Sequence, residues 1–397
     1  MKKKIVVFAL CMAMVLSMAA CGGKSEPAPA PAPAETQAAA AETEAPAEGE
    51  EAEAPAEAPV VEAGEVMTPD QLLALATEGL ETSIDCEPIE LTMACSGTLD
   101  GTVGGDAINA AIQAVSDWTG GNFKVNFYQG GQLGGDTELI EGVQMGTVDL
   151  MQGAPTAQMA LMPNLAVLDI AGLFTDVQSC QSVIDSFYDQ FQTVYNEKGL
   201  RLQAMIAMDF RILSSNKPVQ TAEDLKGLNI RTQENPYHMT FWSQLGTNPT
   251  PLAFGELYIA LQQGMMDAQE NPPTSIVGAK LCEVQKYIVE TNHIPFINTF
   301  VTNQAKYEAM SDAQKKAMDQ FVTMITRYIQ AGTAQDDARL LDICRNEYGI
   351  EVTPVSDAVK ALYPAATMAV IEQMKASGNV DPAFVDAYVA ASGFVAP

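Results

Sequence analysis

Strand-like and helix-like segments alternate along most of this chain, and the alternation limits the fold more than any other feature of the sequence. A strand pattern at 89–95 precedes a helical pattern at 106–118, whose apolar residues share one face, and a second strand pattern follows at 123–127. A glycine-rich turn, a helix from Asp136 to Val143 and a strand at 148–151 complete this run. The β-α-β-α-β order predicts an α/β fold whose mainly parallel sheet carries helices on both faces.

The alternation resumes in the second half of the chain. Strand patterns lie at 201–208, 212–214, 227–231 and 265–268, and the helical patterns between them lie at 237–245 and 254–263. A capping box at Ser311 opens a helical pattern that continues to Tyr348, ahead of Gly349. A helix of this length fits an element that spans two domains better than one packed inside a small domain.

The N-terminal region has a composition of its own. Residues 1–20 join a basic start to an apolar run too short for a stable membrane anchor, so they predict a secretory signal peptide. The run ends on Ala-Ala-Cys, which resembles a bacterial lipobox and predicts lipidation of Cys21; an ordinary signal peptide cut near Ala20 is the alternative. Residues 21–65 are mostly Pro, Ala and Glu and cannot bury a core, so we expect a disordered tether. A lead-in segment at 66–87 follows, in which TPDQLLALA indicates a short helix.

Charge and cysteine content exclude several classes of protein. The chain has 50 acidic and 21 basic side chains, and its net charge of −29 opposes binding to nucleic acid or to an anionic membrane surface. Of its seven cysteines, one lies in the signal peptide and one at the lipidation site. The other five are odd in number and lack zinc-site spacing, which argues against a disulfide framework. We expect them to be buried thiols: Cys86, Cys95, Cys180, Cys282 and Cys344.

Motifs for catalysis and for cofactor binding are missing from the sequence. It has only two histidines, His238 and His293, and no H-E-x-x-H, Walker, G-x-G-x-x-G or G-x-S-x-G motif. The glycine-rich QGGQLGGD segment lacks the Lys-Ser/Thr pair of a phosphate-binding loop and indicates a tight turn instead. We therefore expect no enzyme, no cofactor and no metal site, with His238 in a structural or supporting position.

Two arginines lie at or near the ends of strand patterns. In an open α/β sheet, ligands bind beyond the carboxyl ends of the strands. Arg231 ends the strand pattern of KGLNIRTQENP, and Arg211 lies in DFRILSSN, near a crossing into the second half. A guanidinium stays charged, and its planar fork matches a carboxylate. For either arginine alone, a surface position or a structural salt bridge is the alternative.

Longer motifs around these arginines resemble one known family. LKGLNIRTQENP, GTNPTPLAFGELYIALQQGMMDAQENP and GGQLGGDTELIEGVQMGTVDL are similar to segments of the DctP family, the solute-binding subunits of tripartite ATP-independent periplasmic (TRAP) transporters. The resemblance covers about Glu90 to Ser311. It implies a two-domain, Venus-flytrap-like α/β fold of the periplasmic-binding-protein type, with hinge strands and a long helix that spans both domains.

The resemblance also implies a ligand site. Arg231 matches the arginine that forms the main salt bridge to a ligand carboxylate, and Arg211 matches a second arginine of the family. Asn271 would supply amide hydrogen bonds and Phe254 an apolar wall, although Leu252 stands where methionine is usual.

Further residues are expected close to this site. Gln233, Trp242 and Asp136 are placed near the cleft, and Glu234 either lies at its rim or faces solvent. The domains implied are 88–208 plus 298–335 and 209–297 plus 336–397, closing on the ligand like a hinge.

The implied partners are a small organic acid and a small and a large integral membrane subunit that translocate it, without ATP. We expect a monomer held by its N-terminal lipid on the outer face of the cell membrane, without nucleic acid. Two alternatives are a binding lipoprotein that serves a sensor or another type of transporter, and a secreted enzyme.

Overall fold

The computed structural model describes residues 66–397. The signal peptide, the lipidation site at Cys21 and the tether predicted for 21–65 lie outside the described residues. Within the lead-in segment, the expected helix is α1 (Pro69–Thr77), which begins with a capping box between Thr68 and Gln71. Among the described residues, none of the helices has both the length and the apolarity required to cross a membrane.

The described strands form one nine-stranded sheet with the order β2-β1-β3-β8-β4-β7-β5-β6, and β9 pairs with β8. Its strands are β1 (Ile89–Ala94), β2 (Phe123–Tyr128), β3 (Leu150–Gly153), β4 (Leu200–Ser215), β5 (Asn229–Thr232), β6 (Asn248–Pro251), β7 (Ala268–Asn271), β8 (Tyr287–Asn303) and β9 (Glu351–Pro354).

The longer helices are α2 (Val103–Trp118), α3 (Asp136–Met145), α4 (Val177–Ser186), α5 (Tyr188–Asn196), α7 (Pro236–Gln244), α11 (Asp312–Asn346), α13 (Tyr363–Ala376) and α14 (Pro382–Ser392). The shorter ones are α6 (Ala222–Leu225), α8 (Leu257–Gln262), α9 (Pro273–Gly278), α10 (Gln304–Glu308) and α12 (Asp357–Lys360), with 3-10 turns η1 (Pro155–Gln158), η2 (Pro163–Asp169), η3 (Phe254–Glu256) and η4 (Leu281–Glu283).

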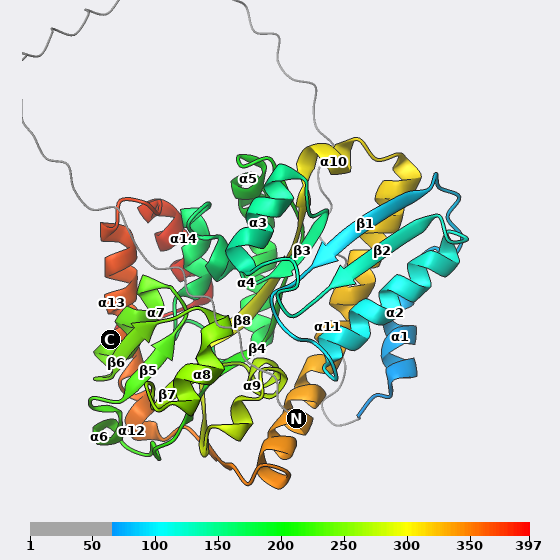
Figure 1. The fold of residues 1–397 in the computed structure, drawn as a ribbon. Coiled ribbons are helices and arrows are strands. Elements are labelled where there is room, and N and C mark those ends of the chain that lie inside the picture. The colour runs from blue at the N-terminus through cyan, green and yellow to red at the C-terminus, as the bar shows by residue number, and fades with distance from the viewer. Residues whose placement is uncertain (1–65) are drawn as a thin grey trace, which may run out of the picture. The chain divides into compact units, whose positions relative to one another are not determined.

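The sheet is parallel toward its two ends and antiparallel at its centre, so the expectation of a mainly parallel sheet is correct only for the ends. β1 pairs in parallel with β2 and β3, and β5 pairs in parallel with β6 and β7. Between these groups, β4 and β8 run antiparallel to each other along most of their length, with irregularities in register. Figure 1 shows β1 and β2 with α1 and α2 at one end, and β5, β6 and β7 with α7 and α8 at the other.

Two strand predictions need correction, and three strands, β6, β8 and β9, were not predicted. The strands expected at 201–208 and 212–214 are one element, β4, which bends through register shifts between Ala207 and Asp209 and between Arg211 and Leu213. The strand expected at 265–268 begins only at Ala268, because the segment before it still closes the turn after α8. β8 mixes polar and apolar residues without strict alternation, and the sequence did not predict it.

Helix α11 confirms the expected long helix that spans the fold. It begins with the predicted capping box at Ser311, and it contacts α1 and α2 in the first half of the fold and α9 and β9 in the second half. The helix approaches its neighbours closely at Gly332, where a Cβ atom would lie 2.5 Å from Cγ2 of Val103 and 3.2 Å from Cδ1 of Leu72. One continuous helix therefore contacts both halves of the fold, and β4 and β8 run between these halves.

Candidate ligand-binding site

A cavity of about 1090 Å³ is lined by residues from both ends of the sheet. One part of its wall comes from the segments that follow β1 and β2, including Ser96, Gly130 and Asp136, the first residue of α3. The other part comes from residues in or after β5 and β7, including Arg231 and Asn271. The cavity thus lies beyond the carboxyl ends of parallel strands, as ligand sites in open α/β sheets generally do.

Arg231 lies in β5 and is 2% exposed. Its Nε and Nη2 atoms donate hydrogen bonds of 2.9 and 2.5 Å to the backbone carbonyl of Leu252, and its guanidinium carbon lies 6.0 Å from the ring centroid of Phe254. Because the contact at Leu252 uses the backbone oxygen, a leucine side chain in place of methionine does not alter it. Burial lowers the pKa of Arg231 to about 10, so the guanidinium remains charged at neutral pH.

The third nitrogen of this guanidinium is left without a partner. Among residues 66–397, no atom accepts a hydrogen bond from Nη1 of Arg231, although the atom is buried. Arg231 lines the cavity. A buried charged donor without an acceptor costs free energy, and an anionic ligand in the cavity would remove that cost.

Arg211 lies in the middle of β4, not at a strand end as expected, and is fully engaged by protein groups. Its Nε donates to Oε2 of Glu270 at 2.5 Å, and its Nη2 donates to Oε1 of Glu270 and to Oδ1 of Asn271, each at 3.0 Å. The amide of Gln233, with its oxygen turned toward Arg211, lies 2.7 Å from Nη1 and 3.0 Å from Nη2. The structural salt bridge that was the alternative for Arg211 is therefore present, and Arg211 still lines the cavity.

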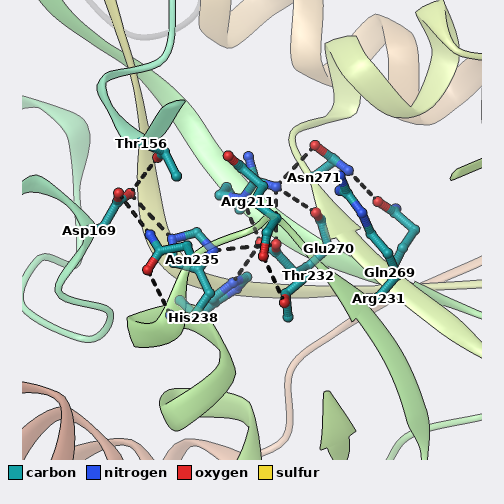
Figure 2. Close-up of polar contacts among 12 residues, drawn as sticks. Thr156, Asp169, Arg211, Arg231, Thr232, Asn235, His238, Gln269, Glu270 and Asn271 are labelled. Atoms are coloured by element: carbon teal, nitrogen blue, oxygen red, sulfur yellow. Dashed lines mark hydrogen bonds and ion pairs between the residues drawn. The ribbon is translucent and has the colours of Figure 1, made fainter. Parts of the chain in front are cut away.

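Glu270 is the centre of this polar cluster, and the sequence analysis missed it. The carboxylate is completely buried and contacts Arg211, Nε2 of His293 at 3.2 Å and Nδ1 of His238 at 3.5 Å (Figure 2). Burial alone would raise the pKa of Glu270, but Arg211 and His238 hold it well below its usual range. The sequence feature that could have identified Glu270 is its position next to Asn271, in the same Q-E-N-P motif and in a buried strand.

His238 is held between two carboxylates. Its Nε2 lies 3.2 Å from Oδ1 of Asp169, which also accepts a hydrogen bond from Thr156, and Asn235 donates to the other oxygen of Asp169 (Figure 2). Burial lowers the pKa of His238, but hydrogen bonds to Asp169 and Glu270 more than offset this effect and raise it to about 9. For His293, by contrast, burial dominates and the pKa is lowered.

Among the buried groups at this end of the cavity, the cations outnumber the carboxylates by one, although the acidic side chains of Asp136, Glu138 and Glu234 also line the cavity. Arg211, Arg231 and His238 are cationic at neutral pH, whereas Glu270 and Asp169 supply two carboxylates within the described residues. Arg211 and His238 contact those carboxylates directly. The guanidinium of Arg231 is the member of this group that no carboxylate contacts.

Most of the predicted site residues line the cavity, and Trp242 does not. The cavity wall includes Arg231, Arg211, Asn271, Phe254, Gln233 and Asp136, together with the exposed Glu234. Trp242 is 0% exposed and lies on the buried face of α7. The centroid of its ring is 4.9 Å from the ring centroid of His293. The prediction that placed Trp242 near the cleft is corrected, because helical spacing turns this side chain into the core behind the polar cluster.

Asp136 is the first residue of α3, at the opposite end of the sheet from Arg231. One of its carboxylate oxygens accepts a hydrogen bond of 2.7 Å from the hydroxyl of Ser96. Burial raises the pKa of Asp136. This part of the wall therefore offers hydroxyl and carboxyl oxygens, and within residues 66–397 no cation forms an ion pair with Asp136.

The comparisons with known proteins agree with this architecture. The family model described as bacterial extracellular solute-binding protein, family 7 (DctP) matches residues 98–377. The 2,3-diketo-L-gulonate-binding periplasmic protein of Escherichia coli K12 is 31% identical over 240 residues, which cover 60% of this chain and 73% of that protein. A solute-binding protein of Verminephrobacter eiseniae is 34% identical over 237 residues, or 59% of this chain and 71% of that protein.

A solved structure is similar over nearly the whole of its own length. The TRAP periplasmic solute-binding protein from Polaromonas sp. JS666, bound to D-erythronate, has a TM-score of 0.68 at 27% identity and covers 76% of this chain and 98% of that chain. The fold, the cavity beyond the strand ends and the family match lead to one conclusion. This chain belongs to the DctP family of bacterial extracellular solute-binding proteins.

Proposed function

We propose that the cavity binds the carboxylate of a small organic acid and that Arg231 is its principal contact. The observation that carries this proposal is that Arg231 lines the cavity while its buried Nη1 atom has no acceptor among the described residues. A ligand carboxylate would accept a hydrogen bond from this guanidinium and neutralise its charge. Charge-assisted hydrogen bonds of this kind contribute roughly 1.5–3 kcal/mol each.

The other residues of the wall take supporting positions in this proposal. Asn271 supplies an amide at the same end of the cavity as Arg231, and Arg211 and Gln269 hold that amide by hydrogen bonds. The half-buried ring of Phe254 gives the cavity an apolar side. Gln233 and Arg211 hold each other in place beside the ligand. Asp136 and Ser96 suit hydroxyl groups at the far end of the ligand.

Because Arg231 is the cation of this group that no carboxylate of the described residues contacts, we expect a ligand with a single carboxylate. A second carboxylate would meet the acidic side chains Asp136, Glu138 and Glu234, which also line the cavity. The relatives named for 2,3-diketo-L-gulonate and solved with D-erythronate are consistent with a carboxylate that carries neutral polar groups.

The family consists of extracellular solute-binding proteins rather than enzymes. We therefore place this protein outside the cytoplasm and propose that it delivers its ligand unchanged to the integral membrane subunits of a TRAP transporter. The hinge would lie in β4 and β8, between a domain of 88–208 plus 298–335 and one of 209–297 plus 336–397. Attachment through a lipid at Cys21 and a monomeric state complete the proposal.

Thermal unfolding of the purified protein against a panel of organic acids tests this function. A ligand at a hundred times its dissociation constant adds roughly 2.7 kcal/mol of stability, which raises the melting temperature by several degrees. A rise with carboxylates that is lost in Arg231→Ala would support the proposal, and recovery of the bound acid unaltered would separate binding from turnover. If no carboxylate raises the melting temperature while a neutral compound does, the assignment of Arg231 is wrong.

A further inference from the structure

Two cysteines far apart in the sequence meet in the core of the second half of the fold. The sulfur atoms of Cys282 and Cys344 lie 2.9 Å apart, although the residues are 62 positions apart in the chain. Cys282 lies in η4, just after α9, and Cys344 lies in the last turn of α11. Their side chains are buried, at 3% and 0% exposure, so the two thiols have contact with each other rather than with solvent.

The surroundings of this pair are rigid and apolar. Both cysteines belong to a core cluster that includes Ile212, Leu257, Ile276 and Leu341. Sulfurs joined in a disulfide lie about 2.05 Å apart, so a small side-chain rotation would bring these two into bonding distance. The remaining described cysteines are Cys86, Cys95 and Cys180, which are also buried and free.

The compartment favours oxidation of such a pair. Disulfides form and persist in extracytoplasmic spaces and are rare in the cytoplasm. The family to which the chain belongs is extracellular. Spacing along the sequence argued against a disulfide framework, but it carries no information on which thiols meet after folding.

We propose that Cys282 and Cys344 form a structural disulfide in the exported protein. The oxidant would be the disulfide form of an extracytoplasmic dithiol oxidase, acting before the core closes. One cysteine thiolate attacks a sulfur of the oxidase and forms a mixed disulfide, and the second thiolate then displaces the oxidase. Formation of the new sulfur–sulfur bond passes two electrons to the oxidase, which leaves as a dithiol and takes up the two protons.

This bond would fix the wall of the cavity to the long helix. Thr274 and Ser275 of α9 line the cavity, and Cys282 follows that helix closely. A link to Cys344 would hold the α9 region against the C-terminal part of α11. The closed loop would contain all of β8 and most of α11, and a loop of that length restricts the unfolded chain strongly. The inference does not depend on the identity of the ligand.

Mass spectrometry of the exported, unreduced protein tests the bond directly. The protein is alkylated in denaturant without reduction and then digested. The expected result is a linked pair of peptides that contain Cys282 and Cys344, lighter by two hydrogens than the sum of the reduced peptides, with Cys86, Cys95 and Cys180 alkylated. Alkylation of both Cys282 and Cys344 in protein isolated from an oxidising compartment would overturn the proposal.

Unfolding with and without a reductant gives a second readout. We expect reduction to lower the melting temperature of the wild type by several degrees and to leave a Cys282→Ala/Cys344→Ala variant unaffected. Cys180→Ala is the matched control, because Cys180 is equally buried but lies in another core cluster. This variant should keep the response to reductant. An equal response in the double variant and in the wild type would contradict the proposed pair.

Discussion

The carboxylate of Glu270 lies 2.5 Å from Nε of Arg211, and both side chains are almost completely buried, at 0% and 3% exposure. This ion pair lies beside the cavity, and it neutralises the charge of Arg211. It leaves Arg231, two strands away in the sheet order, as the arginine of the cavity wall whose guanidinium keeps an unpaired nitrogen in the described structure. The pair therefore decides which arginine is available to an anionic ligand.

Replacing Glu270 with glutamine should destabilise the protein strongly. The Glu270→Gln variant would leave Arg211 and His238 buried without their shared counter-charge, and breaking a buried pair in this way costs about 3–5 kcal/mol. Urea unfolding followed by circular dichroism measures the loss. Glu223→Gln is the control, because Glu223 pairs with Lys226 on the exposed surface, and it should unfold like the wild type. Equal midpoints for the two variants would contradict the role given to Glu270.

Substitutions of Arg231 should separate charge from geometry in ligand binding. Arg231→Ala removes both the charge and the donors, and we expect the affinity for the bound carboxylate to fall by roughly 30-fold or more. Arg231→Lys keeps a charge without the planar fork, so its affinity should lie between those of the wild type and the alanine variant. Isothermal titration calorimetry measures all three. The control is Arg345→Ala, which removes a surface ion pair with Asp342 and should bind the ligand like the wild type. If the Arg231→Lys variant binds as weakly as Arg231→Ala, the planar geometry of the guanidinium, and not its charge, determines the affinity.

Stability should fall as the pH rises through the titration of His238. The pKa of His238 is raised from 6.5 to about 9 in the folded state, so the protonated ring stabilises the fold fully below pH 6.5, and this contribution is lost as the pH approaches 9. A pKa shift of that size corresponds to about 3 kcal/mol in the free energy of unfolding. Urea unfolding at a series of pH values measures it, with His238→Gln as the comparison. The difference in stability between wild type and variant should shrink toward high pH, and a constant difference would count against a charged His238.

Adding a methyl group at Gly332 should disturb the packing of the long helix. In Gly332→Ala the new Cβ would lie 2.5 Å from Cγ2 of Val103, which cannot rotate away without moving its neighbours. We expect a net loss of about 1–3 kcal/mol, despite the better helix propensity of alanine. Thermal unfolding provides the measurement. Gly255→Ala is the control, because a Cβ atom there would meet no other atom within 4 Å in the described structure. An equal loss of stability in the Gly255→Ala variant would contradict the explanation by packing.

Local sequence patterns were sufficient to predict much of the fold. The helices α1, α2, α3, α7 and α11 were predicted because capping residues and a 3.6-residue apolar period are properties of one segment. The same holds for β1, β2 and β5. Arg231 was found as a candidate ligand contact because it ends a recognisable strand within a longer motif.

Pairing between distant segments could not be predicted in this way. β8 has no clean alternation, since it is buried at the centre of the sheet, and its antiparallel pairing with β4 depends on where both strands lie in space. The same limit explains why Arg211 was placed at a strand end, whereas the error at Trp242 was local, because helical spacing in α7 directs that side chain into the core.

By itself, then, the sequence determined many of the elements of the α/β fold, the family motifs and the position of Arg231 in a strand, but not β8. The tertiary structure decided which charges are already paired: it brought Glu270 to Arg211 and His238, and left Nη1 of Arg231 without an acceptor in the described part of the chain. It also brought Cys282 to Cys344. The physical reason is that periodicity and capping act over a few residues, whereas charge neutralisation and thiol pairing depend on distances between side chains that only the folded chain defines.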